Sequence, residues 1–194
     1  MFLTNSTSPL ISLISFNLFS HGMHTSLRSF SANNLENSED SLTAGLENLG
    51  VQPSDISDVI LTHLHFDHTG GSTKLENGKY VPAFPNAKYH VQKDQFNWAQ
   101  NPSNRDKGSY IDHTFKALGE HGVFNFFDGD SQFEDQIELL RIDGHTIAQQ
   151  MVKISDSANT YLFCADLIPT MHHIPIPYVM GYDIQPLETV KEKE

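Results

Sequence analysis

Apolar residues recur with two different periods along the chain, which predicts a mixture of helices and strands. Leucines at positions 42, 46 and 49 share one helical face and are followed by Gly50, a pattern typical of a short amphipathic helix with a stop signal. Val59-Ile60-Leu61 is a continuous apolar run and predicts a buried strand. Asn77-Gly78 favours the tight turn of a hairpin.

The second half of the chain continues this mixture. A helix is predicted over Asp94–Gln100, ended by Pro102, and a last one over Asp183–Glu194, with Pro186 near its first turn. Pro169, Pro175 and Pro177 mark an irregular loop. Further strands are expected at Tyr89–Gln92, Ile137–Ile142, Gln150–Ile154 and Tyr161–Cys164. The predicted fold class is therefore a layered arrangement of strands and helices, α/β or α+β.

Residues 1–35 differ from the rest because they contain no acidic residue and a single arginine, Arg28. A transit peptide would carry more arginines, and a secretory signal would begin with basic residues that Met1–Ser8 lacks. The apolar stretch Leu10–Phe19 is too short and too interrupted to span a membrane. We expect a leader, a poorly ordered segment or a strand of the domain here, with the main domain over residues 36–194.

Length, net charge and cysteine content exclude several classes of binding partner. The chain has 194 residues, about one domain, and a net charge of −12. Such a surface repels phosphate backbones and anionic lipid, so we expect neither nucleic acid nor membrane as a partner. Cys164 is the one cysteine, which excludes an internal disulfide and fits a reducing compartment such as the cytoplasm. The sequence does not indicate an oligomeric state.

Candidate metal ligands are concentrated directly after the predicted strand at 59–61. Thr62–Gly71 contains the pattern H-x-H-x-D-H, and imidazole and carboxylate groups bind Zn²⁺ at about 2.0–2.2 Å. Two later strand ends carry the same residue types, and catalytic groups tend to lie where a strand's carboxyl end meets a loop. The candidate ligands are His63, His65, Asp67, His68, His145 and Asp166.

This pattern resembles the metallo-β-lactamase superfamily, whose hallmark is H-x-H-x-D-H followed by a Gly-His-Thr segment and a strand-end Asp. Leu61–His68 is especially similar to the lactonase-like and general hydrolase branch, and the resemblance covers about residues 41–194. It implies a four-layer αββα sandwich with a metal site at one edge. It also implies that His63, His65 and His145 hold one metal, that Asp67 and His68 contribute to a second, and that Asp166 bridges them.

Two features usual in this superfamily are not found in the sequence. Members usually begin with a pair of strands ending in a Leu-Ile-Asp-Thr-Gly-like turn, and they carry a last metal-binding histidine beyond a helix. His172 and His173 are the only histidines after Asp166, and neither is an obvious replacement. We therefore expect an incomplete sandwich, apparently truncated at both ends, that binds its second metal weakly.

The resemblance implies a metal-dependent hydrolase of a small ester, lactone or related substrate, acting through metal-activated water. Zinc is the expected cofactor, as one or two ions, although iron or manganese would fit the same donors. Two alternatives remain open. One is a non-catalytic, truncated metal-binding remnant, and the other is a mononuclear iron dioxygenase of the same superfamily.

Several residues have two interpretations. Asp67 could be catalytic, orienting the nucleophile or passing its proton to the leaving group, or it could be a ligand alone. The apolar loop Leu167–Met180 could wall a substrate pocket, with His173 or Tyr178 donating a hydrogen bond to a substrate carbonyl, or it could simply pack on the domain.

Other residues with reactive side chains are expected to be structural. Cys164 is interpreted as a small buried strand residue. His90, His113 and His121 lie far from the motif in sequence and are predicted to be ordinary surface or helix histidines.

Overall fold

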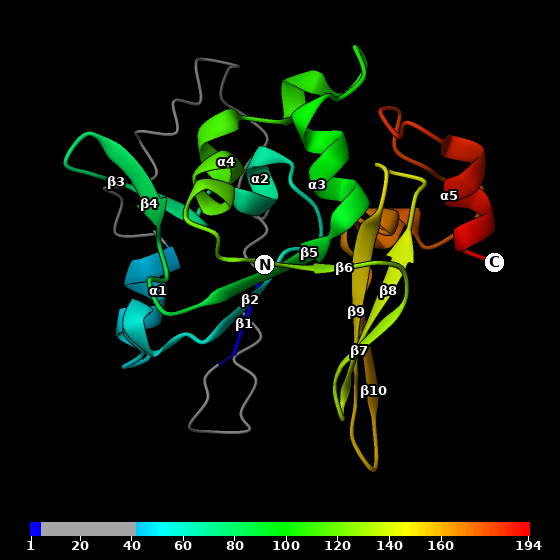
Figure 1. Cartoon of the computed structure of the whole chain (residues 1–194). Helices are drawn as coiled ribbons and strands as arrows, with labels where there is room; N and C mark the ends of the chain where they lie inside the picture. Colours follow the sequence, from blue (N-terminus) through cyan, green and yellow to red (C-terminus); the bar gives the residue numbers. More distant parts are fainter. Residues whose placement is uncertain (5–41) are drawn as a thin grey trace. The chain divides into compact units, whose positions relative to one another are not determined.

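The computed structural model describes residues 1–4 and 42–194 (Figure 1). Most of the predicted leader lies in residues 5–41, outside the described residues, so the domain boundary at residue 36 stays a prediction. Phe2–Thr4 form strand β1, which pairs antiparallel with β2 (Asp58–Ile60). Among the described residues no helix combines the length and apolar character needed to cross a membrane.

In the part of the chain that the structure describes, the strands form three sheets (Figure 1). In the first, the order is β1-β2-β5-β6, with β5 at Lys88–Gln92 and β6 at Phe124–Phe127. The second is an antiparallel meander in the order β10-β9-β8-β7. The third is the hairpin of β3 (Thr73–Glu76) and β4 (Lys79–Pro82). The meander strands are β7 (Ser131–Glu134), β8 (Ile137–Ile142), β9 (Gln149–Ser155) and β10 (Thr160–Phe163).

Short helices connect these strands. The α-helices are α1 (Leu42–Asn48), α2 (Phe66–Thr69), α3 (Lys93–Gln100), α4 (Asp112–Glu120) and α5 (Pro186–Glu192). The 3-10 helices are η2 (Pro53–Asp55), η3 (Lys107–Ser109), η4 (Ala165–Leu167) and η5 (Met171–His173).

Contacts between Cα atoms divide the chain into two compact units. The described residues of the first lie in 1–61, 65–89 and 111–124 and contain α1, α2, α4, β1, β2 and the hairpin. Their buried apolar side chains include Val59, Phe84 and Phe115.

The second unit comprises residues 62–64, 90–110 and 125–194, with α3, the meander and α5. Ile142, Met151 and Leu167 form a buried cluster against which Leu140, Cys164 and Ile168 pack. Cys164 does pack there, but it is half-buried and lies one residue after the end of β10, so the prediction of a buried strand residue holds only in part. Partial burial raises the pKa of its thiol.

Strong sequence patterns located their elements well. The strand predicted at Ile137–Ile142 has those bounds, and the first helix ends at Asn48, two residues before Gly50. At the hairpin, Asn77 and Gly78 have φ values of 52° and 79°, the left-handed pair that a tight two-residue turn requires. The last helix begins at Pro186 rather than Asp183, because proline suits a helix's first position.

The prediction that His90 is a surface or helix histidine is wrong. His90 lies in strand β5 and is 3% exposed. Its ring packs against Phe133, with centroids 4.7 Å apart, and its Nδ1 lies 3.0 Å from the Asn125 amide nitrogen. A strand that is buried on both faces leaves no solvent side for a polar residue, so His90 is a core residue held by a side-chain amide.

Candidate metal centre

Backbone hydrogen bonds fix the segment that carries His63 in the second unit. The Gln150 N–H donates to the Thr62 carbonyl at 2.8 Å, and the Leu64 N–H donates to the Gln95 side-chain oxygen at 3.2 Å. His63 is fully buried, and its Nδ1 lies 3.2 Å from the Thr62 hydroxyl. The other ring nitrogen, Nε2, lies 4.0 Å from Asp166 Oδ2.

A single glutamine connects this segment to the loop that carries His145. Gln95, on α3, is fully buried. Besides accepting from Leu64, its amide donates to the Ile147 carbonyl at 2.5 Å. Because an unpaired buried amide or carbonyl is costly, this bridge keeps the two histidine-bearing loops in a fixed relation within the second unit.

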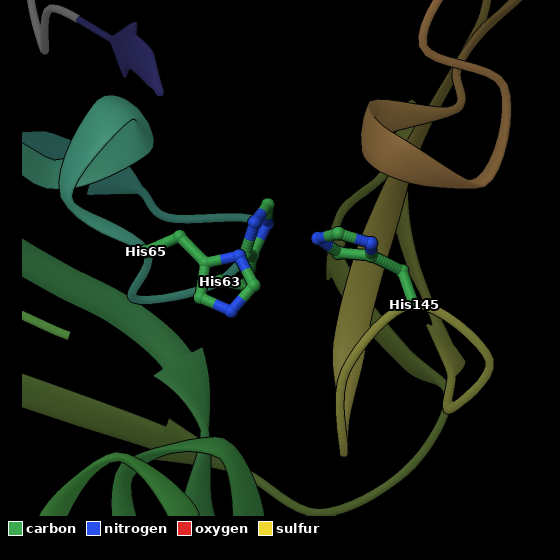
Figure 2. Close-up of side chains that lie close together, drawn as sticks. All are labelled: His63, His65 and His145. Atoms are coloured by element: carbon green, nitrogen blue, oxygen red, sulfur yellow. The ribbon is translucent and has the colours of Figure 1, made fainter. Parts of the chain in front are cut away.

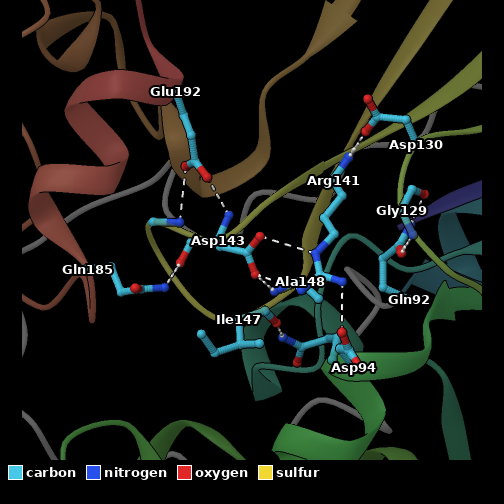
Figure 3. Close-up of polar contacts among 12 residues, drawn as sticks. Gln92, Asp94, Gly129, Asp130, Arg141, Asp143, Ile147, Ala148, Gln185 and Glu192 are labelled. Atoms are coloured by element: carbon cyan, nitrogen blue, oxygen red, sulfur yellow. Dashed lines mark hydrogen bonds and ion pairs between the residues drawn. The ribbon is translucent and has the colours of Figure 1, made fainter.

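The His145 loop, residues 143–148, follows strand β8 and is held from within by Asp143 (Figure 3). The Asp143 carboxylate accepts from the Ala148 N–H at 2.8 Å and from two nitrogens of Arg141 at 3.1 Å each. Hydrogen bonding to Asp143 raises the pKa of the Arg141 guanidinium, which also donates to Asp94 at 2.8 Å. The charged pair thus ties both ends of the loop to β8 and α3.

Asp166 lies beside two buried histidines of the second unit, His63 and His145. Its Oδ2 is 3.3 Å from His145 Nε2 and 4.0 Å from His63 Nε2. The two imidazoles, each at most 1% exposed, meet edge to face with ring centroids 5.2 Å apart (Figure 2). This distance is well within what a shared ion allows, since zinc–nitrogen bonds are about 2 Å long.

The backbone that presents Asp166 is unusual. Asp166 is the middle residue of η4, directly after β10, and the preceding Ala165 has a φ of 47°. A left-handed conformation at a residue with a Cβ costs on the order of 1 kcal/mol and persists where the surroundings enforce it. Here that conformation turns the chain sharply after the strand and directs the carboxylate toward the histidines.

The remaining motif residues lie around α2 in the first unit. His65 precedes the helix, and its carbonyl accepts from the His68 N–H, the Thr69 N–H and the Thr69 hydroxyl, each at 3.0 Å. Asp67 and His68 are on the helix, with Asp67 Oδ2 3.6 Å from His68 Nε2. This one-turn helix therefore places Asp67 and His68 side by side, directly after His65.

The donor set fits a metal ion. His63 and His145 are buried imidazoles with the Asp166 carboxylate beside them, so these three side chains of the second unit could hold one. Neutral imidazole with a carboxylate is a donor set that zinc accepts and that iron or manganese also accepts.

The two predicted substrate-binding residues lie on the loop after Asp166. The His173 Nδ1 lies 2.9 Å from the Thr170 hydroxyl within η5. The Tyr178 side chain is 60% exposed, while its carbonyl accepts from the Lys193 ammonium at 3.0 Å. Neither contact tests a role in substrate binding, so both assignments stay predictions.

The sequence analysis missed the residues that support the ligands. Gln95, Arg141, Asp183 and Glu192 contact the ligand-bearing loops but match no motif. Each of the four belonged to a predicted helix or strand and had no role assigned in the site. Their partners are up to 52 residues away along the chain, as for Gln95 and Ile147, so no local pattern marks them.

Replacing Tyr110 by Phe is expected to destabilise the second unit by about 1–2 kcal/mol. The Tyr110 hydroxyl lies 2.7 Å from the hydroxyl of Thr146, the neighbour of His145, and both residues are buried. The substitution leaves Thr146 with a buried polar group that has lost this partner. Chemical denaturation measures the change, and Tyr161→Phe, at a side chain 59% exposed, serves as the matched control with almost no expected effect.

Comparison with known protein families agrees with this site. A family model described as the metallo-beta-lactamase superfamily matches residues 22–191, most of the chain. The chain belongs to the metallo-beta-lactamase superfamily. The resemblance inferred from the H-x-H-x-D-H pattern is thereby confirmed, and so is the mixed α+β fold class, since solved structures of this fold match the chain.

Proteins similar to this chain include N-acyl homoserine lactonases. The N-acyl homoserine lactonase AttM of Azorhizobium caulinodans is 26% identical over 159 residues, which are 79% of this chain and 57% of that protein. A probable metal-dependent hydrolase from Staphylococcus aureus is 27% identical, with a TM-score of 0.73 over 81% of this chain and 55% of its own.

A third similar protein is an N-acyl homoserine lactone hydrolase whose solved structure has N-hexanoyl-L-homoserine bound at its catalytic metal centre. It is 24% identical to this chain and has a TM-score of 0.63 over 80% of this chain and 56% of that one, which shows a shared fold. The chain thus spans a little more than half the length of these relatives.

Proposed function

We propose that this protein is a zinc-dependent hydrolase of a small ester, lactone or related substrate. In this proposal His63, His65 and His145 hold one ion, with Asp166 beside them. Asp67 and His68 contribute to a second ion that shares Asp166. The observation that carries the proposal is the position of the Asp166 carboxylate, 3.3 Å and 4.0 Å from the Nε2 atoms of two buried histidines.

Burial makes a purely structural role for this cluster unfavourable. Imidazole rings and a carboxylate lose hydration when they leave water, and this cost is offset only by strong partners such as an ion. His63 and His145 are at most 1% exposed, and the Asp166 side chain is 16% exposed. The partial exposure of the Asp166 side chain is compatible with access for a ligand.

The ion, the buried histidines and Asp67 would each supply a different part of the hydrolysis. A bound zinc ion lowers the pKa of water to about 7 and so supplies hydroxide at neutral pH for attack on a carbonyl carbon. The buried walls formed by His63 and His145 exclude bulk water from the nucleophile's surroundings. Asp67, on α2, orients the nucleophile or carries its proton to the leaving oxygen.

Relatives support the substrate class. Proteins named as N-acyl homoserine lactonases match most of this chain, and a substrate of that name is a cyclic ester that carries an acyl group. The loop after Asp166 carries the exposed apolar side chains of Met171, Ile174 and Ile176. Such side chains suit an apolar portion of a substrate, and His173 or Tyr178 would donate to its carbonyl.

Metal analysis combined with a substrate panel tests the proposal. Purified protein is expected to contain zinc, measured as metal per chain by mass spectrometry, and to hydrolyse at least one ester or lactone. Chelation should abolish this hydrolysis, and added zinc should restore it.

Two results would contradict the proposal. Protein that retains iron but no zinc, and consumes oxygen with a thiol substrate, would indicate a dioxygenase. Protein that binds metal and hydrolyses no member of the panel would favour a non-catalytic metal-binding role.

A further inference from the structure

We infer that Asp183 is a positioning residue that fixes the imidazole of His145 with its proton on Nδ1 and its Nε2 directed to the metal. The inference rests on the proposed metal-binding function and extends it to a residue outside the motif. Asp183 lies just before helix α5, in the same compact unit as His145.

The contact between the two side chains sets the position of the ring proton. Asp183 Oδ1 lies 3.0 Å from His145 Nδ1, and both side chains are 1% exposed. An ionised carboxylate can only accept, so Nδ1 must be the donor. In that tautomer Nε2 is the unprotonated nitrogen, and this is the atom that lies 3.3 Å from Asp166 Oδ2.

The second oxygen of Asp183 is also engaged. Asp183 Oδ2 accepts from the Thr189 hydroxyl at 3.0 Å, which anchors the carboxylate to α5. Arg105 holds the adjoining backbone by donating to the Asp183 carbonyl at 3.2 Å and the Gly181 carbonyl at 2.8 Å. The carboxylate therefore has little freedom to rotate away from His145.

The energetics argue for a functional carboxylate. A buried carboxylate is costly unless it is paired with a charge or is well hydrogen-bonded. The side-chain partners described here for Asp183 are a hydroxyl and an imidazole. A metal ion on the far side of that imidazole makes Nδ1–H a stronger donor, so the carboxylate and the ion stabilise each other through the ring.

The residues that follow Asp183 also hydrogen-bond to the backbone of the His145 loop. The Ile184 N–H donates to the His145 carbonyl at 3.2 Å, and the Gln185 N–H donates to the Gly144 carbonyl at 2.9 Å. The Glu192 carboxylate accepts from the N–H groups of Asp143 and Gly144 at 2.5 and 3.0 Å (Figure 3). The segment from Asp183 to Glu192 thus holds both the ring and the main chain of this loop.

Asp183→Ala tests the inference in the zinc-loaded full chain, with two readouts besides activity. Zinc affinity is measured by competition with a chelator, and ¹⁵N NMR detects the His145 Nδ1–H proton. We expect the wild type to show a slowly exchanging Nδ1–H signal. Asp183→Ala should lose that signal and bind zinc about 10–100-fold more weakly, the usual effect of removing a residue that orients a ligand.

Two further variants separate positioning from general stability. Asp183→Asn keeps the side chain's shape and removes its charge, so it should fold normally and bind zinc with an affinity between those of the wild type and Asp183→Ala. Glu188→Ala removes a carboxylate from the same helix, where it pairs with Lys191 at 2.6 Å on the surface. This control should keep both the signal and the affinity of the wild type.

The outcomes distinguish this inference from the proposed function. If the wild type binds zinc and Asp183→Ala keeps the same affinity and Nδ1–H signal, the positioning role is wrong while the metal site stands. If Asp183→Ala does not fold, wild-type affinity in folded Asp183→Asn overturns the inference. If the wild type binds no zinc, the proposed function fails and this inference fails with it.

Discussion

The His63→Ala variant is expected to bind zinc at least about 100-fold more weakly than the wild type and to lose nearly all hydrolytic activity. This loss of affinity is larger than the usual loss when a residue that only orients a ligand is removed, because here the ligand itself is removed. The His63 ring is fully buried and its Nε2 faces Asp166, so no neighbouring water can easily take its place. Metal per chain and hydrolysis rate measure the two losses.

His121→Ala is the matched control for this variant. His121 follows the last residue of α4, and its side chain is exposed. An isolated surface substitution usually changes stability by less than about 0.5 kcal/mol, so zinc content and rate should stay at wild-type values. Equal zinc content in folded His63→Ala and in the control would exclude His63 as a ligand.

Gly144→Ala is expected to destabilise the protein by about 3 kcal/mol and to reduce its zinc content. A Cβ at position 144 would lie 2.4 Å from the Thr189 hydroxyl and 2.5–2.6 Å from Thr189 backbone atoms. Helix α5 would have to move, because overpacking against backbone cannot be relieved by a change of rotamer. That movement would also disturb the contact between Asp183 and His145.

Gly181→Ala is the control for the glycine substitution. A Cβ at position 181 meets no atom within 4 Å, so the free energy of unfolding should change by less than about 0.5 kcal/mol. Urea denaturation of both variants gives the comparison. If Gly144→Ala is as stable as Gly181→Ala, close packing of α5 on the His145 loop is not needed for the fold.

The parts of the site that are local in sequence could be predicted. His63, His65, Asp67 and His68 lie within six residues, directly after an apolar strand, and their spacing alone indicated metal binding. His145 and Asp166 were predicted because each follows a strand whose apolar pattern is clear. The strand predicted at Ile137–Ile142 has the predicted bounds.

The support for these ligands could not be predicted, because it comes from contacts between distant segments. Gln95 connects Leu64 to Ile147, and Asp183 reaches His145 across 38 residues. A glutamine on a helix or an aspartate before a proline-started helix has no sequence feature that distinguishes it from a solvated residue. Only the packing of α3 and α5 in the second unit gives these side chains a role.

Elements with weak patterns were missed for a different reason. Strands β6 and β7 have partly exposed residues on both faces, so their apolar residues do not alternate cleanly. Helix α4 contains Gly119 and has aspartate, histidine and threonine at its first three positions, which lowers its helical signal. His90 was misplaced because its prediction rested on its distance from the motif in sequence, although the residue lies within the predicted strand Tyr89–Gln92.

The most direct test of the metal centre is anomalous X-ray diffraction at the zinc edge from crystals grown with zinc. We expect an anomalous peak about 2.0–2.2 Å from Nε2 of both His63 and His145, on the side where Asp166 lies. Fully occupied zinc elsewhere on the chain, with no peak beside these two histidines, would contradict it.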